Sequence, residues 1–172
     1  MNTRRITLNA VLISIAVVIS VVESFIPSVG VPGIKLGLAN IIILITLYEL
    51  GIVDAIIVNL FRVFLASLLR GTIFSMGFFM SFAGAFLSLG IMIVFYLFIK
   101  KFSIIGVSVL GAFFHVIGQI LVAIIYLGTA YIVYYLPFIA LASIVTGIFV
   151  GIVANLIIKK GVIRKQKETY NF

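Results

Sequence analysis

The chain has 172 residues, of which 65% are hydrophobic and only 9% are charged. A soluble domain of this size cannot hide so much apolar surface, because its exterior needs polar side chains. The composition therefore excludes a soluble globular fold and predicts an all-α integral membrane protein. The formal net charge of +8 does not indicate nucleic-acid binding, because the basic residues lie at the ends of apolar runs, as membrane topology requires.

Six apolar runs are each about 17 to 25 residues long, the length that a bilayer requires. They predict six transmembrane helices, over residues 6–26, 32–48, 52–69, 77–99, 104–126 and 134–158. We expect a single six-helix membrane domain over residues 1–160, followed by a basic cytoplasmic tail over residues 161–172. The first run lacks a small-x-small cleavage site, so it is interpreted as a retained helix and not as a signal peptide.

The basic residues predict the orientation of the helices. Six helices place both termini on one side of the membrane, and nine of the twelve Lys and Arg residues then lie on that side: Arg4, Arg5, Lys100, Lys101, Lys159, Lys160, Arg164, Lys165 and Lys167. Because loops rich in Lys and Arg stay in the cytoplasm, both termini are predicted to be cytoplasmic. The connections near residues 27–35, 70–77 and 126–134 then face outside.

Several polar side chains fall inside the predicted membrane region, where a charged group costs roughly 2.5–3.5 kcal/mol at a helix centre. Such groups face a bundle interior or a cavity, so they predict a polar pocket that opens to the outside. The candidate substrate-binding residues are Glu23, Lys35, Asn40, Arg62, Arg70, His115 and Gln119. Three of them are cations and one is a carboxylate, which favours a ligand with a phosphate, diphosphate or carboxylate group.

Most of these residues also have a structural interpretation, and both interpretations stay open at this point. Glu23 and Arg62 could form an ion pair between helices, and Arg70 could extend to lipid headgroups. His115 and Gln119 lie one turn apart on one helix face and could hydrogen-bond to another helix. The aromatic cluster at residues 126–135 could contact an apolar part of a ligand or form a lipid-facing belt.

Three charged residues lie near the ends of the second predicted helix: Lys35, Glu49 and Asp54. Lys35 is predicted to lie in the first turn of this helix, after Pro32 at the first helical position. The helix dipole disfavours a cation there, so either Lys35 and the helix end hold an anion together or Lys35 extends to outer-leaflet phosphates. Glu49 and Asp54 flank Gly51 in a short cytoplasmic turn, where we expect both carboxylates to be solvated.

The residue types that catalysis and metal binding need are scarce. The chain has no cysteine, one histidine and one aspartate, and it lacks a glycine-rich phosphate-binding loop. We therefore expect a protein that is not an enzyme, binds no cofactor and has no metal site.

Small residues recur four positions apart in three predicted helices: Ala10 and Ser14, Gly77, Ser81 and Ala85, and Gly147 and Gly151. Such faces let helices approach closely in lipid. Each face could serve packing within the bundle or docking of a partner membrane protein. Asn59 is expected to bond between helices and not to bind a ligand.

Two segments resemble a bacterial membrane family. They are PGIKLGLANI over residues 32–41 and NLFRVFLASLLRG over residues 59–71, and the family is known as heptaprenyl diphosphate synthase component I or Gx transporter. The size, the six helices and the cytoplasmic termini also look like the substrate-binding S components of energy-coupling factor (ECF) transporters. The resemblance implies an S-component-like helix bundle in the bacterial cytoplasmic membrane.

An S component implies a small-molecule substrate, here a vitamin or a prenyl or quinone precursor, captured from outside. It also implies three partner subunits, a transmembrane coupling subunit and two cytoplasmic ATPases, in contact with membrane lipid and without nucleic acid. S components often dock the coupling subunit through small residues of the first helix, which implies a docking role for Ala10 and Ser14; serine stands where alanine is common.

The synthase name implies an alternative, a non-catalytic membrane accessory subunit of heptaprenyl diphosphate synthase. Catalytic prenyl synthase subunits resemble one another through paired Asp-rich motifs, and a chain with one aspartate has none. A purely structural membrane scaffold is the third interpretation, and the charges inside the membrane argue against it.

Overall fold

The computed structural model describes residues 3–25, 35, 37–99 and 102–161. The elements in chain order are α1 (Thr3–Glu23), α2 (Asn40–Glu49), α3 (Ile52–Leu69), α4 (Met76–Phe98), α5 (Ile104–Leu127), the 3₁₀ helix η1 (Ala130–Tyr135) and α6 (Leu136–Lys159). The described part of the chain contains no strand, which confirms the all-α class. Four helices, α1, α3, α4 and α5, and the continuous segment Ala130–Lys159 are each long and apolar enough to cross a membrane, so the fold is that of a multi-pass membrane protein.

Short polar residues and one glycine fix the ends of α4 and α5. Ser75 accepts a hydrogen bond from the Phe78 N–H, and Ser103 accepts one from the Gly106 N–H; both caps satisfy donors that have no partner within the helix. Gly128 ends α5 with a φ of 63°, a left-handed conformation that favours glycine. The predicted third, fourth and fifth helices agree with α3, α4 and α5 to within one residue at each end.

The second predicted helix is shorter than expected. α2 begins at Asn40 and has ten residues, a rise of about 15 Å against a hydrocarbon thickness of roughly 30 Å. The prediction of a helix from residue 32 onward was therefore wrong at its start, and Lys35 does not lie in a helical turn. Gly37 has a φ of +82°, so the helix cannot continue backward through it. Pro32 lies outside the described residues.

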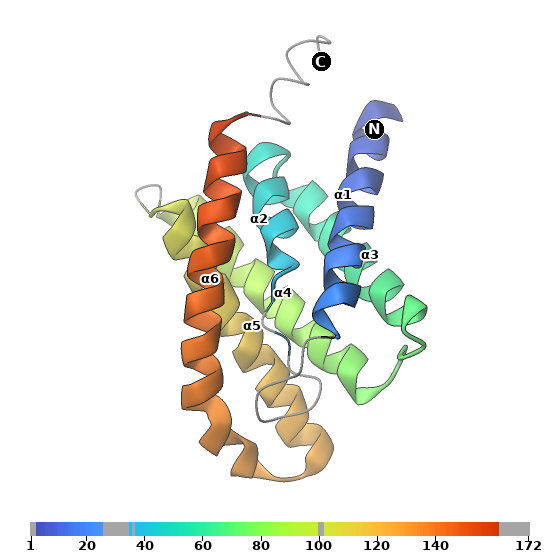
Figure 1. The fold of residues 1–172 in the computed structure, drawn as a ribbon, viewed down its shortest axis with the longest axis vertical. Helices are drawn as coiled ribbons and strands as arrows, with labels where there is room; N and C mark the ends of the chain where they lie inside the picture. Colours follow the sequence, from blue (N-terminus) through green and yellow to red (C-terminus); the bar gives the residue numbers. More distant parts are fainter. Residues whose placement is uncertain (1–2, 26–34, 36, 100–101, 162–172) are drawn as a thin grey trace.

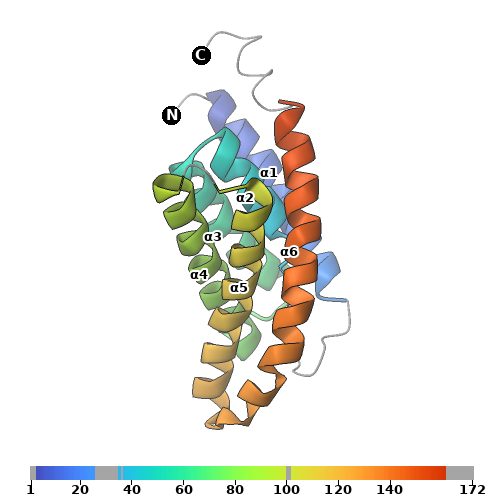
Figure 2. The same cartoon turned by 90° about the vertical axis from the view of Figure 1, so that its left-hand side faces the viewer.

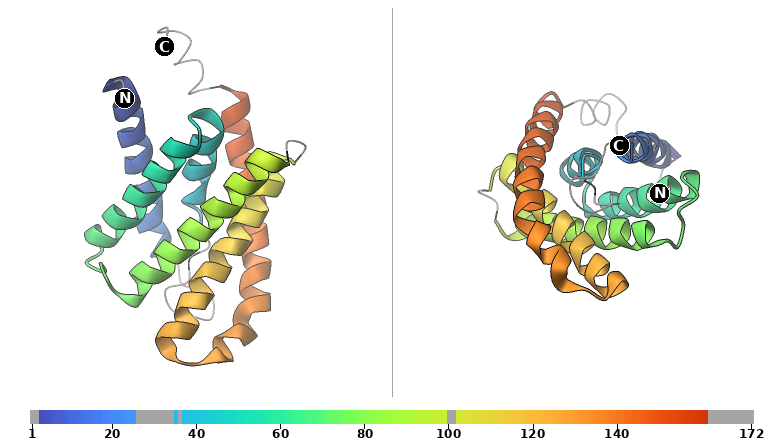
Figure 3. Two further views of the ribbon diagram at one scale, coloured as in Figure 1. Left: turned by 180° about the vertical axis from the view of Figure 1, so that it is seen from behind. Right: turned by 60° about the horizontal axis from the view of Figure 1, so that its bottom comes forward.

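The helices form one bundle around α2. The first turn of α1 and the last turn of α6 lie at the same end of the bundle (Figure 1). Figure 2 shows α5 between α4 and α6, the two helices that it contacts most closely. α2 contacts all five other α-helices and lies among them in the end-on view of Figure 3.

Glycines bring α5 close to both of its neighbours. A Cβ atom at Gly118 of α5 would lie 2.8 Å from the Ala83 carbonyl oxygen of α4. Cβ atoms at Gly147 and Gly151 of α6 would lie within 2.8 Å of Cα atoms in α5. The small-residue face at Gly147 and Gly151 therefore packs within the bundle, and it is not a free docking face.

Apolar cores occupy both ends of the bundle. The core near the termini is built around α2 and includes Leu12, Ala16, Ile43, Leu44, Leu47, Leu89 and Met92. The core near the opposite end consists of Met80, Val116, Ile120, Ala123, Ile132 and Ile139. Buried polar residues lie between the two cores; on α4, for example, Ser81 and Ser88 separate Met80 from Leu89. This polar layer contains the candidate site.

Candidate functional site

A single glutamine holds the backbone of the segment that precedes α2. Gln119 of α5 is fully buried. Its Oε1 accepts a hydrogen bond from the Lys35 N–H at 2.8 Å, and its Nε2 donates to the Lys35 carbonyl at 2.9 Å. These two bonds satisfy both backbone groups of a residue that has no helical partner. The predicted interhelical role of Gln119 is thus replaced by a bond to a non-helical segment.

Glu23, the last residue of α1, holds the next part of the same segment. Its Oε1 accepts hydrogen bonds from the N–H groups of Gly37 at 2.6 Å and Leu38 at 3.2 Å. The Glu23 side chain is 5% exposed, and it forms no ion pair with Arg62. The interpretation of Glu23 and Arg62 as an ion pair, one of the two left open by the sequence, is therefore not the arrangement in the structure, where the carboxylate accepts from backbone donors.

Arg62, near the middle of α3, is held by two asparagines. Its Nη1 donates to Oδ1 of Asn40 at 3.3 Å, and its Nη2 donates to Oδ1 of Asn59 at 2.9 Å. The asparagines are fixed in turn, since Asn40 donates to the Ser88 hydroxyl and Asn59 donates to the Ala85 carbonyl. Asn59 thus bonds between helices as predicted, and it also orients the guanidinium of Arg62.

Arg62 is buried with part of its donor capacity unused. The residue is 3% exposed, and its buried Nε has no hydrogen-bond partner among the residues that the structure describes. A buried unsatisfied donor on a charged group costs a few kcal/mol, so natural structures rarely keep one without a reason.

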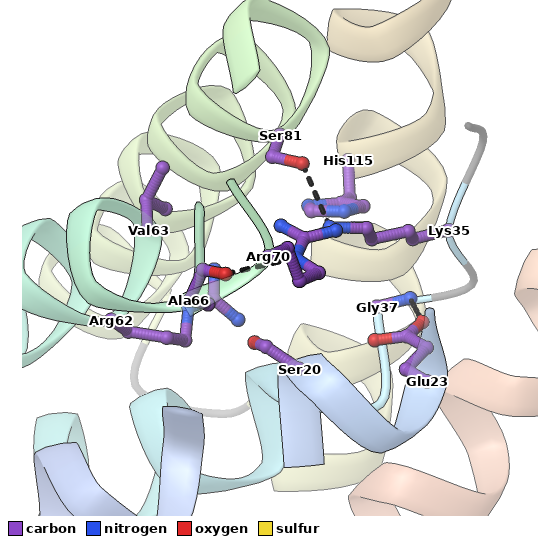
Figure 4. A pocket seen from close by; sticks show the side chains of 10 residues that line it. All are labelled: Ser20, Glu23, Lys35, Gly37, Arg62, Val63, Ala66, Arg70, Ser81 and His115. Carbon is purple, nitrogen blue, oxygen red and sulfur yellow. Dashed lines mark hydrogen bonds between the residues drawn. The ribbon is translucent and has the colours of Figure 1, made fainter. Parts of the chain in front are cut away.

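The other two cations reach the same region from different elements. Lys35 donates from Nζ to the Ser81 hydroxyl of α4 at 3.0 Å. Arg70, which directly follows α3, donates from Nε to the Ala66 carbonyl at 2.9 Å and from Nη2 to the Ser67 hydroxyl at 3.4 Å. Arg70 thus bonds to its own helix and points into the bundle (Figure 4).

His115 of α5 lies against the two glycines that make room for it. The imidazole is 4% exposed. A Cβ atom at Gly37 would lie 3.4 Å from its Cδ2, and one at Gly84 of α4 would lie 3.2 Å from its Nδ1. A Cβ atom at Gly84 would also lie only 2.7 Å from the His115 carbonyl oxygen, so α4 and α5 would have to move apart to accept a side chain there.

These residues line one small cavity of about 20 Å³, shown in Figure 4. The lining residues come from α1, α3, α4, α5 and the segment before α2: Ser20, Glu23, Lys35, Gly37, Arg62, Val63, Ala66, Arg70, Ser81 and His115. The cavity has room for about one water molecule, so a larger ligand enters only if a lining side chain moves. Asn40 and Gln119 are not lining residues. They support two lining residues instead, since Asn40 accepts a hydrogen bond from Arg62 and Gln119 accepts one from the backbone N–H of Lys35.

Lys35 lies in the segment between α1 and α2, outside the membrane-spanning helices. Burial lowers the pKa of its ammonium group, the positive charges of Arg70 and Arg62 lower it as well, and Glu23 partly opposes them, so that the resulting pKa is about 7. The side chain therefore changes its charge near neutral pH, unlike an exposed lysine.

Asp54 contradicts the prediction of a solvated turn. Its side chain is fully buried in the first turn of α3 and accepts hydrogen bonds from Nε of Arg5 at 3.1 Å and Nη2 of Arg5 at 2.5 Å. Nδ2 of Asn9 donates to the same carboxylate at 2.7 Å. Asp54 therefore joins α3 to α1 near the end of the bundle that holds the termini.

The predicted docking residues lie on the outer face of α1. Ala10 and Ser14 are both exposed, and the Ser14 hydroxyl donates to the Ala10 carbonyl at 2.8 Å. In this they differ from Gly147 and Gly151 of α6, which are buried.

Sequence reasoning missed five lining residues as members of the site: Ser20, Gly37, Val63, Ala66 and Ser81. Ser81 was noted only as a small packing residue. Ser81 could have been identified by its hydroxyl group and by its position one turn before Gly84, on the helix face that meets His115. Within the described residues, no group of three or more His, Asp or Glu side chains could hold a metal ion.

A separate, open hollow of about 400 Å³ lies beside η1 and is lined by Ala130, Tyr131, Val133 and Tyr134. The rings of Tyr131 and Tyr134 are stacked, with centroids 6.2 Å apart. Both residues are highly exposed, which suits an aromatic belt at a membrane interface.

Comparison with known proteins identifies a family but no characterised relative. No curated protein and no solved structure matches the chain. The family model described as heptaprenyl diphosphate synthase component I matches residues 12–157, a range that includes the whole polar layer and every lining residue of the cavity. The chain therefore belongs to the heptaprenyl diphosphate synthase component I family.

Proposed function

We propose that this chain is the substrate-binding membrane subunit of an ECF-type importer, and that it captures a small anionic or amphiphilic molecule from outside the cell. The observation that carries the proposal is that the buried Arg62 and the partly buried Lys35 and Arg70 line one cavity together with a single carboxylate, Glu23. Buried charges in membrane proteins are costly and usually mark a pathway or a binding site. A vitamin or a prenyl or quinone precursor with an anionic group has matching chemistry.

The proposed membrane arrangement has six passes, the second of which is the short helix α2, preceded by the non-helical segment that holds Lys35. Both termini lie on the cytoplasmic side of the bacterial membrane in this proposal, because Arg4 and Arg5 lie in the first turn of α1 and Lys159 and Lys160 at the end of α6, at the same end of the bundle (Figure 1). The polar layer then lies in the outer half, within reach of a substrate that arrives from outside. Residues 1–160 form one membrane domain in this proposal, and residues 161–172 form its basic tail.

Coupling to ATP hydrolysis requires partners, a transmembrane coupling subunit and two ATPases. The face of α1 around Ala10 and Ser14 is the proposed docking surface, because it is exposed and its small side chains permit close helix approach.

Co-purification tests the importer role. The chain is expressed with an ECF coupling subunit and its two ATPases from the same bacterium, and the complex is isolated in a mild nonionic detergent. Ser14→Leu should weaken the complex, because the larger side chain keeps the helices apart. Val145→Leu, on an exposed position of α6, is the matched control and should leave it intact. Absence of any complex with the wild-type chain would reject the importer role.

The second candidate is an accessory subunit of heptaprenyl diphosphate synthase, which the family description favours. In this role the cation cluster would hold the diphosphate end of a substrate or product beside a separate catalytic subunit. Prenyl-chain synthesis by the purified catalytic component, measured with and without this chain in lipid vesicles, separates the two candidates. Synthesis that depends on this chain supports the accessory role.

A further inference from the structure

The cation cluster carries more positive charge than its own residues neutralise. Three cations, Lys35, Arg62 and Arg70, and one carboxylate, Glu23, line the cavity, which leaves a formal excess of two positive charges. Glu23 is already engaged by the N–H groups of Gly37 and Leu38. The ion pair of Arg5 and Asp54 lies at the other end of α1 and takes no part in this balance.

The cluster also has hydrogen-bond donors to spare. Among the described residues, Nε of Arg62 is buried without a partner. Arg70 uses Nε and Nη2 on its own helix, and its Nη1 makes no bond within the described part of the chain. Lys35 has three N–H donors, and its ammonium group bonds to Ser81 alone of the residues that the structure describes. These donors come from two elements and face one cavity, as the recognition of a single group with several oxygens requires.

From this balance we infer that the site binds a terminal phosphate group that carries two negative charges, either free or as a monoester. The inference rests on the proposed capture function, because it concerns the same site. A dianion neutralises both excess charges, whereas a carboxylate or a phosphodiester, each with one negative charge, leaves one cation unpaired in a low-dielectric interior. Three terminal phosphate oxygens accept from the free donors of all three cations.

Entry of the phosphate group requires one side-chain movement. The cavity of about 20 Å³ is too small for a phosphate, and the Lys35 ammonium group borders it through its single bond to Ser81. Rotation of this flexible side chain opens the space and brings the ammonium group to the anion. The remainder of a monoester stays outside the cavity, since Val63 and Ala66 close the side next to α3.

The test compares four anions on the full-length protein in a nonionic detergent at pH 7, in buffer free of phosphate and sulfate. Hexyl phosphate, a monoester, is mostly dianionic at this pH, and inorganic phosphate is a mixture of its dianion and monoanion, whereas methyl hexyl phosphate and hexanoate are monoanions. Calorimetry should give Kd values for the dianions at least about tenfold lower than for the monoanions. Hexyl phosphate binding tighter than inorganic phosphate identifies an amphiphile as the ligand; the reverse order identifies free phosphate.

Charge-removing variants test the residues. Arg70→Gln should reduce the preference for hexyl phosphate over hexanoate to less than about threefold, because the excess charge falls to one. Arg62→Gln should reduce this preference by a similar factor, provided that the variant folds. If the Arg62→Gln variant does not fold, the result for Arg70→Gln alone decides the test. Lys159→Gln, which removes a charge at the opposite end of the bundle, should keep the wild-type preference.

Equal or tighter binding of the monoanions, or no binding of any of the four anions, would overturn the inference. These outcomes are distinct from failure of the proposed function. A chain that prefers dianions but forms no complex with the coupling subunit rejects only the importer role. A chain that forms the complex but shows no preference rejects only the phosphate assignment.

Discussion

The side chain of Gln119 bonds both backbone groups of Lys35, its Oε1 accepting from the N–H at 2.8 Å and its Nε2 donating to the carbonyl at 2.9 Å. One residue of α5 thus does for Lys35 what a neighbouring strand does in a sheet. Because the backbone is fixed in this way, the ammonium group of Lys35 reaches Ser81 and the cation cluster. Gln119 is therefore a positioning residue for the site.

Replacement of Gln119 tests this role. Gln119→Leu keeps the approximate volume but removes both bonds, and it leaves two backbone groups of Lys35 without partners. We expect a loss of about 1–3 kcal/mol in the free energy of unfolding, together with weaker binding of hexyl phosphate. Unfolding in mixed micelles and calorimetry on the folded variant measure the two effects. Anion binding equal to that of the wild type would show that Lys35 does not depend on Gln119.

Anion binding should weaken as the pH rises through 7. Burial and the nearby charges of Arg70 and Arg62 lower the pKa of Lys35 to about 7, although the charge of Glu23 opposes the shift. His115 also faces the cavity. The lysine therefore loses its proton above this pH and contributes one positive charge less. Inorganic sulfate, which stays dianionic, is the suitable probe: its Kd should rise between pH 6 and pH 8.5. In Lys35→Met the rise should be absent, and a persistent rise would assign it to another group.

The same lowered pKa sets the pH dependence of stability without ligand. Between about pH 7 and the ordinary lysine value of 10.5, the unfolded chain holds a proton on Lys35 that the folded chain has lost. Stability therefore rises with pH across this window. Below it, the folded protein must bury the charged ammonium group. Lys35→Met should raise the melting temperature at pH 6 more than at pH 9, measured by circular dichroism; an equal shift at both pH values would contradict the assignment.

The carboxylate of Asp54 joins α1 to α3. Asp54→Asn removes the buried negative charge that Arg5 and Asn9 hold. We expect a loss of about 1–3 kcal/mol in stability, with anion binding unchanged because the polar cavity lies further along the bundle. Glu49→Gln, the other carboxylate flanking Gly51, is the matched control and should cost less than about 0.5 kcal/mol. A double-mutant cycle with Arg5→Met should show that the two losses are not additive.

The close packing of α5 against α4 at Gly118 predicts that alanine substitutions will affect stability differently at crowded and at open glycines. Gly118→Ala places a Cβ atom 2.8 Å from the Ala83 carbonyl oxygen of α4, so the helices must move apart. Overpacking of this kind costs about 1–3 kcal/mol. Gly90→Ala, at a position of α4 where a Cβ atom meets nothing within 4 Å, should be neutral or stabilising, because alanine has the higher helix propensity. Equal melting temperatures for the two variants would argue against the close α4–α5 packing.

The sequence predicted the long helices well because their signals are local. Apolar length sets their extent, and residues such as Ser75, Ser103 and Gly128 mark their ends. The short helix α2 escaped this reasoning. Residues 32–48 are apolar enough to span a bilayer, and only tertiary bonds from Glu23 and Gln119 make a non-helical backbone at Lys35 and Gly37 acceptable.

The site was predicted in part for a similar reason. Charge and membrane position identified Lys35, Arg62 and Arg70 as candidates, and these residues do line one cavity. Which carboxylate would pair with which cation depends on helix rotation, which a single sequence does not specify. Asp54 was therefore assigned to solvent although Arg5 bonds to it. For Glu23 an ion pair with Arg62 and a role in binding both stayed open, and neither anticipated its bonds to backbone N–H groups.

The helix α2 covers only about half of the hydrocarbon thickness, and this affects the route by which a ligand arrives. Lys35, Gly37 and Leu38 present backbone N–H groups beyond the helix start, and Gln119 and Glu23 take the place that water would have. An opening of the segment toward the acyl chains would expose these donors where nothing accepts from them, at several kcal/mol each. An opening toward the aqueous phase would let water bond them at once. The short helix α2 thus favours a ligand that enters along the membrane normal, from the aqueous phase, over one that enters sideways from the lipid.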